Sequence, residues 1–258
     1  MTEDNHSYAP VRSLRVAVMF LTRIPTGWIE GLETKDLAKA SWAFPVVGLI
    51  VGGISGAALY AAAASDLFPL ACALIALCVQ AFITGALHED GLADVIDGLG
   101  GYEKTKILEI MRDSRVGSYG VLALIFSVGI RATALASVAG PGIAWGALIA
   151  AACISRGVLP MIMYTMPAAR ADGLSVNAGQ PSLKGVAIAL ALGVIFLFVL
   201  LPLSAALMGI VIGASLVGVL AYWAQRRLGG QTGDVLGAAQ QLIEIAVLVA
   251  AAGWSASY

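Results

Sequence analysis

Residues 88–98 concentrate four carboxylates and a histidine at the end of a long apolar segment. On a helix, which advances about 100° per residue, Asp90, Asp94 and Asp97 share one face within roughly a 60° wedge. Carboxylates this close repel one another unless a hard cation lies between them, and oxygen-only ligands favour Mg²⁺ or Mn²⁺ over zinc. We therefore expect these aspartates to be catalytic residues and ligands of Mg²⁺. An acidic, solvated helix start with Asp90 near the N-cap is the simpler alternative.

Two glycines and the histidine complete this stretch. Gly91 and Gly98 each cost about 1 kcal/mol of helix propensity relative to alanine. We interpret them as positions where a bulky substrate comes close to the backbone. His88 lies on the far side of the helix from the aspartates, so it either contacts substrate or caps the helix.

The composition of the chain predicts the kind of fold that positions this stretch. Hydrophobic residues make up 59% of the chain, charged residues make up 12%, and the mean hydropathy is +0.89. Soluble proteins carry roughly a quarter charged residues. We therefore expect an all-α, polytopic integral membrane helical bundle in which residues 1–258 form a single domain. Cys72, Cys78 and Cys153 lie in apolar segments without metal-ligand spacing, so we expect neither disulfides nor cysteine ligands.

Apolar runs of about 17–25 residues identify candidate membrane spans. Residues 185–225 are too long for one crossing, and Pro202 marks a hairpin turn within them. Residues 12–20 are too short to cross and suit a short interfacial helix, although an amphipathic start to the bundle explains them equally well. Residues 1–10 lack a basic signal-peptide region, so we expect a short disordered tail. About seven spans are predicted, over residues 41–64, 67–87, 116–139, 142–166, 185–201, 203–224 and 235–253.

The basic residues test this topology independently. If the spans alternate in direction, all Lys and Arg residues outside them lie on one side, and the opposite connections carry none. By the positive-inside rule the basic side is cytoplasmic. We therefore expect a protein of the bacterial cytoplasmic (inner) membrane, with its amino terminus and the active-site segment 88–115 in the cytoplasm and its carboxyl terminus outside.

Two arginines fall inside predicted spans, where a charge at the helix centre costs at least about 2.5–3.5 kcal/mol. Arg131 and Arg156 should therefore face the bundle interior. Arg156 and Glu244 have similar predicted depths, which makes them candidate partners and candidate substrate-binding residues. A structural ion pair or snorkelling explains Arg156 equally well, and explains Arg131 better than function does.

Two segments on the predicted cytoplasmic side carry groups that suit phosphate. Arg112 and Arg115 are i, i+3 neighbours, and two guanidinium groups on one face suit a diphosphate, with anionic lipid headgroups as the alternative. Residues 226–234 lead a glycine-rich backbone into a helix amino terminus, which favours an anion. The substrate-binding residues expected in this second segment are Gly230, Gln231, Thr232, Gly233 and Asp234.

Taken together, aspartates, basic groups and glycine turns on one side indicate Mg²⁺-assisted transfer at a phosphorus centre. Residues 226–234 lack the Gly-Lys-Ser/Thr ending of a Walker A motif, so nucleoside triphosphate hydrolysis is not supported. Ser114, Ser118 and Thr232 have no base partner in the sequence, which argues against covalent catalysis.

Several motifs in the same order resemble the cobalamin 5′-phosphate synthase family, also called adenosylcobinamide-GDP ribazoletransferases. Residues 88–98 are similar to the family's His-x-Asp-Gly-Leu-Ala-Asp-x-x-Asp-Gly signature, with Glu89 at the variable position. Residues 169–182 are similar only through Gly173 and Leu174. The resemblance covers most of the chain, and the other matching segments are 20–25, 44–49, 110–117, 155–157 and 229–234.

The resemblance implies a late step of coenzyme B12 assembly. A hydroxyl of α-ribazole, or of its 5′-phosphate, attacks the corrinoid-side phosphorus of adenosylcobinamide-GDP, and GMP leaves. Asp90, Asp94 and Asp97 would hold Mg²⁺ against the diphosphate, and one aspartate would accept the proton of the hydroxyl. Arg112 and Arg115 would neutralise charge on the leaving GMP. The expected partners are these small molecules and the lipid membrane, with no nucleic acid, and an oligomer is compatible with the sequence.

Other functions remain open at this point. A CDP-alcohol phosphotransferase-like lipid enzyme also uses aspartates at the membrane edge, but its signature has Ala-Arg where this chain has Ala93-Asp94. An ion-coupled transporter would use Arg131, Arg156 and Glu244 at membrane depth, yet no internal repeat is evident. A structural scaffold ranks last, because it has no use for three aspartates on one helix face. The sequence does not distinguish free α-ribazole from its phosphate.

Overall fold

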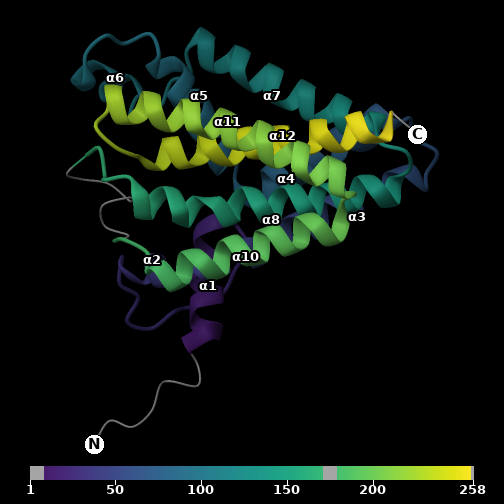
Figure 1. Ribbon diagram of the computed structural model, residues 1–258, viewed down its shortest axis with the longest axis horizontal. Helices are drawn as coiled ribbons and strands as arrows, with labels where there is room; N and C mark the ends of the chain where they lie inside the picture. Colours follow the sequence, from purple (N-terminus) through teal and green to yellow (C-terminus); the bar gives the residue numbers. More distant parts are fainter. Residues whose placement is uncertain (1–8, 171–178, 257–258) are drawn as a thin grey trace, which may run out of the picture.

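The computed structural model describes residues 9–170 and 179–256, and the regular elements in these two ranges are helices. Their order is α1 (Ala9–Leu21), α2 (Asp36–Ala40), η1 (Ser41–Ala43), α3 (Phe44–Ala63), α4 (Pro69–Thr84), α5 (Leu87–Gly98), α6 (Lys104–Ile110), α7 (Ser118–Ser137), α8 (Pro141–Thr165), α10 (Leu183–Leu200), α11 (Leu203–Arg227) and α12 (Gly233–Ser255). The long helices α7, α8, α10, α11 and α12 run roughly along one direction, and α1 crosses that direction (Figure 1). The predicted all-α fold is confirmed.

The described residues contain six helices that are long and apolar enough to cross a membrane, or up to seven if the bent pair α4 and α5 counts as one span. This confirms the polytopic bundle expected from composition. The predicted span over residues 67–87 differs most, because α4 ends at Thr84 and α5 leaves it at an angle of 91°. With only 12 residues, α5 is too short to cross a bilayer. Its acidic side chains therefore do not lie on any of the six described helices that are long enough to cross by themselves.

Two consecutive residues in the left-handed region produce the bend between α4 and α5. Gly85 has a φ of 65° and Ala86 a φ of 55°, a conformation that glycine adopts freely and alanine adopts under strain. The backbone N–H of Arg23 donates to the carbonyl oxygen of Ile83 at 2.6 Å. A Cβ atom on Gly85 would lie 2.2 Å from the Arg23 side chain. The chain that follows α1 is therefore packed into the bend and helps to orient α5.

The predicted interfacial helix over residues 12–20 lies within α1. Residues 1–8 of the predicted tail lie outside the described residues. Ala9 and Pro10 belong to α1, so the tail prediction was wrong for these two positions. The guanidinium of Arg12 donates to the carbonyl oxygen of Glu30 at 2.7 Å, and that of Arg15 to the carbonyl oxygen of Thr26 at 2.9 Å. The basic side chains of α1 thus hold the loop that leads to α2.

The centre of the bundle is formed by α8 and α12. Most of the apolar stretch of each is buried, whereas α10 and α11 expose large apolar side chains such as Val199 and Val211. Such faces are expected where lipid replaces water. The helices approach closely at small residues. A Cβ atom on Gly48 of α3 would lie only 2.3 Å from the carbonyl oxygen of Ala152 in α8, so glycine at this position permits the contact.

The same packing explains the two glycines of the acidic helix. A Cβ atom on Gly91 would lie 2.8 Å from the carbonyl oxygen of Asp234, and one on Gly98 would lie 3.0 Å from Cγ of Met111. These contacts give both glycines a packing role, and the interpretation that they make room for a bulky substrate stays a prediction. Gly91 lets α5 pack against the start of α12, and Gly98 lets the chain after α6 fold back over the end of α5.

Candidate active site

Two helix starts meet at the site. Asp90 and Asp94 lie on α5, and Asp234 lies in the first turn of α12, which packs against α5 at Gly91. The pKa of Asp94 is raised to about 7, chiefly by burial and then by the negative charges of Asp90, Asp234 and Asp97. The structure therefore gathers a fourth aspartate, Asp234, with the three on α5. The sequence analysis expected Asp234 to be a substrate-binding residue of the glycine-rich segment that leads into the last helix.

Asp97 accepts hydrogen bonds from the backbone at the start of α7. Its Oδ2 accepts a hydrogen bond from the backbone N–H of Gly117 at 2.7 Å, and its Oδ1 accepts one from Gly120 at 2.9 Å. A Cβ atom on either glycine would lie 2.4 Å from an Asp97 oxygen. A carboxylate at a helix start satisfies unpaired amides and suits the helix dipole. Asp97 thus fastens α5 to the start of α7, and its predicted role as a metal ligand stays a prediction.

The carboxylates fit a divalent cation by donor type and charge. Within the described ranges, no three His, Cys, Asp or Glu side chains converge closely enough to form a metal site. Asp90 and Asp94 nevertheless offer oxygen ligands on α5, and the negative charges of Asp90, Asp234 and Asp97 add to burial in raising the pKa of Asp94. A hard cation lowers such repulsion and prefers these ligands. Binding one would require the side chains to draw together.

Arg170 is a site residue that the sequence analysis missed. Its guanidinium Nη2 lies 3.4 Å from Oδ2 of Asp234. Two backbone hydrogen bonds bring it there: Gln231 N–H donates to Pro167 at 2.8 Å, and Ala169 N–H donates to Gln231 at 2.9 Å. These bonds join the chain after α8 to the loop before α12. A basic residue in the loop beyond the end of α8 was the available signal, but no motif distinguished it.

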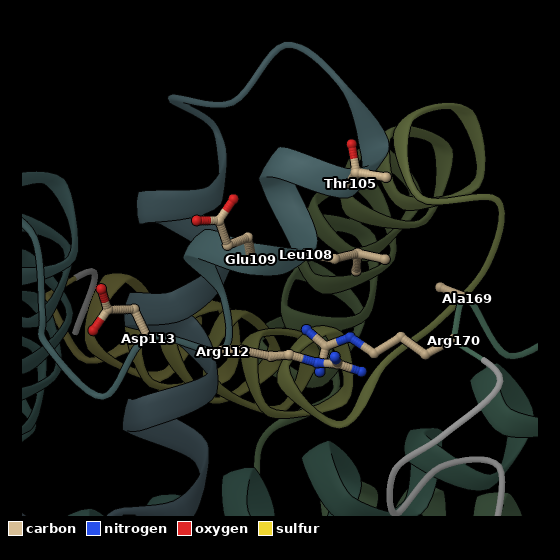
Figure 2. Close-up of a pocket in the computed structure, with 7 residues that line it drawn as sticks. All are labelled: Thr105, Leu108, Glu109, Arg112, Asp113, Ala169 and Arg170. Carbon is tan, nitrogen blue, oxygen red and sulfur yellow. The ribbon is translucent and has the colours of Figure 1, made fainter.

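Arg112 and Arg170 line one open cleft of about 630 Å³, together with Thr105, Leu108, Glu109, Asp113 and Ala169. Figure 2 shows the two guanidinium groups extending into it from opposite walls, Arg112 from the chain after α6 and Arg170 from the chain after α8. Nε of Arg170 is buried and has no hydrogen-bond partner among the described residues. Two like charges in one cleft are best accommodated by an anion with several oxygens.

Arg115 does not share the cleft, so the prediction that Arg112 and Arg115 present one helical face was wrong. The helix α6 ends at Ile110. Oδ1 of Asp113 accepts the backbone N–H of Arg115 at 3.0 Å, a local turn that competes with helix continuation. The Arg115 side chain is 87% exposed and pairs with Asp113 at 2.7 Å. This pairing lowers the pKa of Asp113 to about 2.

The glycine-rich loop is bonded mainly within the protein. Thr232 is the N-cap of α12, where its hydroxyl accepts the backbone N–H of Val235 at 3.2 Å and donates to Asp234 at 3.2 Å. A Cβ atom on Gly230 would lie 2.1 Å from the carbonyl oxygen of Pro167, so only glycine fits there. Gly230, Gln231 and Thr232 are buried, whereas Gly233 is exposed. Phosphate binding by this loop stays a prediction, and its observed contacts position Asp234 and Arg170.

A buried polar cluster lies beneath the site. Arg131 lies 3.4 Å from Glu89 and 3.6 Å from Glu244. Gln240 donates to Glu244 at 2.7 Å, and Gln241 donates to Glu89 at 3.1 Å. The cluster links α5, α7 and α12, and Gln80 of α4 joins it through a hydrogen bond to Glu244. Glu89, which the sequence analysis treated as variable, is therefore the partner of Arg131.

The candidate pair Arg156 and Glu244 is not formed among the described residues. Arg156 is fully buried and its Nη1 donates to the carbonyl oxygen of Ala152 at 3.1 Å. The ion-pair partner of Glu244 is Arg131. Similar predicted depth along the membrane does not fix which helix face a side chain occupies. Substrate binding by Arg156 and Glu244 stays a prediction.

His88 lines the same cavity as Asp90, although helical spacing predicts that it lies on the far side of α5 from the aspartates. It is 2% exposed, and its Nε2 has no hydrogen-bond partner within the described part of the chain. The residue at the N-cap of α5 is Ala86, without a side-chain capping bond. The capping alternative for His88 is therefore wrong. Its ring lines a second cavity, which Asp90 and Asp234 also line.

Comparisons with known proteins identify the family of this chain. The family model described as cobalamin-5-phosphate synthase matches residues 13–252. A relative from Bradyrhizobium diazoefficiens, named adenosylcobinamide-GDP ribazoletransferase, is 48% identical over 95% of this chain and 94% of its own length. Relatives with the same name from Mesorhizobium japonicum and Rhizobium etli are 43% and 42% identical, each over 92% of this chain and over 91% and 94% of their own lengths. No solved structure shows a significant match. The chain therefore belongs to the cobalamin-5-phosphate synthase family.

Proposed function

We propose that this chain is a membrane-bound adenosylcobinamide-GDP ribazoletransferase that acts in the late steps of coenzyme B12 biosynthesis. It joins adenosylcobinamide-GDP to α-ribazole, or to α-ribazole 5′-phosphate, and releases GMP. The family match and the 48% identical relative support this activity. The observation that carries it is the placement of a carboxylate cluster beside a cleft with two arginines, linked through the contact between Asp234 and Arg170.

The reaction is a substitution at phosphorus. The ribazole hydroxyl forms a new P–O bond at the corrinoid-side phosphorus, the P–O bond to GMP breaks, and the hydroxyl proton passes to an aspartate of the cluster. The cleft lined by Arg112 and Arg170 receives the diphosphate, where the guanidinium groups stabilise charge on the leaving phosphate. Arg170 takes the role that the sequence had assigned to Arg115.

We propose Mg²⁺ as the cofactor. Asp90 and Asp94 would hold it, with Asp234 as the nearest further carboxylate and Asp97 as the third ligand that the sequence predicts. Bound there, the cation would neutralise the carboxylates and the diphosphate oxygens together. The raised pKa of Asp94 supports this assignment in part, because burial is its main cause and the negative charges of Asp90, Asp234 and Asp97, which a cation would neutralise, add to it.

We also propose that the protein lies in the bacterial inner membrane with its amino terminus and its site in the cytoplasm. Arg227 donates to the carbonyl oxygens of Gly101 and Tyr102, so basic residues gather at the same end of the bundle as the carboxylates. The positive-inside rule places that end in the cytoplasm. Impermeant thiol labelling checks this: Phe68→Cys, at the other end, should react from outside intact cells, and Tyr102→Cys should not.

The activity is tested with protein in lipid nanodiscs, supplied with adenosylcobinamide-GDP, α-ribazole and Mg²⁺. Chromatography should show GMP and a corrinoid product in equal amounts. The product should disappear with Asp94→Asn or with EDTA. Asp66→Asn makes the same chemical change at an exposed turn after α3 and should retain activity.

The alternatives make different predictions in this assay. A natively folded protein that forms no GMP, but releases CMP from a CDP-alcohol, would establish the lipid enzyme instead. Substrate-dependent ion uptake into proteoliposomes without GMP would establish a transporter. GMP formation that persists in EDTA would retain the transferase and reject the Mg²⁺ proposal.

A further inference from the structure

A second cavity adjoins the carboxylates, since Asp90 and Asp234 line it, and it shares no lining residue with the arginine-lined cleft. It has a volume of about 260 Å³ and is lined by residues of α1, α2, α3, α5, α8 and α12. Its walls include Leu21, Phe44, Leu159 and Met163, all buried apolar side chains. The reaction as proposed needs two substrates, and the cleft with Arg112 and Arg170 suits only the anionic one. The cavity is therefore a place for a largely uncharged group.

One end of this cavity is polar. His88, Asp90 and Asp234 line it, and two of these belong to the carboxylate cluster. His88 is 2% exposed, and its Nε2 has no hydrogen-bond partner in residues 9–170 and 179–256. A buried ring nitrogen without a partner costs about 1–3 kcal/mol. A bound molecule that supplies a polar atom at this end would relieve that cost.

The volume limits the occupant. Pockets that hold a whole drug-sized ligand usually measure about 300–1,000 Å³, so this cavity accommodates one ring system and excludes a corrinoid. A lipid acyl chain would fill the apolar walls, but it would offer no polar atom to His88, Asp90 or Asp234 at the polar end. A flat heterocycle joined to a sugar satisfies both ends, because its ring packs on the apolar walls and its hydroxyls reach the aspartates.

We propose that this cavity binds the heterocyclic base of the acceptor nucleoside, with His88 contacting a polar atom of the base or ribose. This inference rests on the proposed function and adds the location of the acceptor. The acceptor then approaches the carboxylates from the His88 side, and the diphosphate approaches from the Arg170 side. Asp234 lies between the two, since it lines the cavity and contacts Arg170 at 3.4 Å.

The test fills the cavity without touching the carboxylates. Leu159→Phe adds volume at one wall, and Leu190→Phe makes the same change in a separate apolar cavity between α8, α10, α11 and α12. Overpacking typically costs 1–3 kcal/mol, so the KM for α-ribazole should rise about tenfold or more in Leu159→Phe. The KM for adenosylcobinamide-GDP should not change, and Leu190→Phe should match the unmodified protein in both.

The polar end is tested at His88. His88→Phe keeps a ring of similar size and should raise the KM for α-ribazole, whereas His88→Gln keeps a polar terminus and should restore part of the affinity. A purely structural histidine would instead lower kcat or folding yield in both variants and leave the KM for α-ribazole unaffected. That result would overturn the proposed contact.

Direct binding separates this inference from the proposed function. If the unmodified protein forms no GMP, titration of α-ribazole into nanodiscs still decides the matter, because binding that Leu159→Phe weakens supports the cavity assignment. If GMP forms and Leu159→Phe leaves the KM for α-ribazole unchanged, the acceptor site lies elsewhere. Mass spectrometry that finds a phospholipid retained by the unmodified protein and lost in Leu159→Phe, with unchanged α-ribazole binding, would assign the cavity to lipid.

Discussion

The site combines a group of carboxylates around Asp94 with the guanidinium groups of Arg112 and Arg170 in the cleft. Burial and then the neighbouring carboxylates raise the pKa of Asp94 to about 7, and Arg170 lines the cleft with Arg112 while pairing with Asp234 at 3.4 Å. The carboxylates around Asp94 repel one another until a proton or a cation neutralises them. Functional sites often lower the stability of the folded protein. Substitutions at Asp94 and Arg170 test the roles of these two residues.

For Asp94 we expect an effect of pH on the stability of the metal-free protein. Its pKa in the folded state lies above the ordinary value of 3.8, so the folded protein binds more protons than the unfolded chain between about pH 4 and 7. Stability should therefore fall as the pH rises through that window. Asp94→Asn should melt at a higher temperature than the unmodified protein at pH 8, and the difference should shrink towards pH 4. Asp66→Asn should show no such trend.

For Arg170 we expect a loss of nucleotide-substrate recognition. Removing a charged hydrogen-bond donor costs about 1.5–3 kcal/mol, so Arg170→Gln should lower kcat/KM for adenosylcobinamide-GDP by about ten- to a hundredfold. Arg115→Gln removes the same charge from an 87% exposed side chain and should have little effect. If Arg115 rather than Arg170 acts with Arg112, as the i, i+3 spacing predicts, Arg115→Gln should lower kcat/KM more than Arg170→Gln does. Steady-state kinetics of the two variants therefore distinguish the two assignments.

At the scale of elements, the position of α5 decides where the aspartates lie. The left-handed Gly85 and Ala86 turn it away from α4, Gly91 brings it against α12, and Asp97 fastens it to the start of α7. The acidic helix is therefore held at its beginning, its middle and its end. Rigid support of this kind is needed to keep several like charges in one place.

We expect Gly91→Ala to disturb this support. Its Cβ would meet a backbone oxygen at 2.8 Å, which cannot rotate away, so the helices must separate at a cost of about 1–3 kcal/mol. The melting temperature and the transferase rate should both fall. Gly53→Ala introduces the same methyl group in α3, where nothing lies within 4 Å, and should reduce neither. Equal effects of the two substitutions would refute close packing at Gly91.

At the scale of the whole molecule, the buried polar cluster connects the site to the bundle. Gln80, Glu89, Arg131, Gln240 and Glu244 come from α4, α5, α7 and α12 and are joined by hydrogen bonds and ion pairs. Through Gln240, which donates to Ser155 at 3.1 Å, the cluster also reaches α8. Buried charges are tolerated only when they are paired, so this cluster fixes how five helices face one another.

We expect Arg131→Met to lower the free energy of unfolding by about 3–5 kcal/mol, because it leaves the two buried carboxylates of Glu89 and Glu244 without their ion-pair partner. Adding Glu244→Gln should recover part of the loss, since one of those charges is then removed. Lys106→Met breaks an exposed pair with Glu109 and should cost at most about 1 kcal/mol. Denaturant unfolding in detergent measures all three, and similar losses for Arg131→Met and Lys106→Met would exclude the cluster as a stabilising centre.

The sequence by itself determined the fold class, the approximate spans and the acidic stretch, because apolar length and helical spacing are local properties of the chain. It also identified the family through motifs in order. The tertiary structure decided which groups meet. Arg170 reaches Asp234 through a loop contact, and Glu89 pairs with Arg131 across two helices. Arg115 lies outside the cleft because α6 ends at Ile110 and Arg115 pairs with Asp113. These outcomes depend on helix rotation and on side-chain competition for partners, which spacing along one segment does not specify.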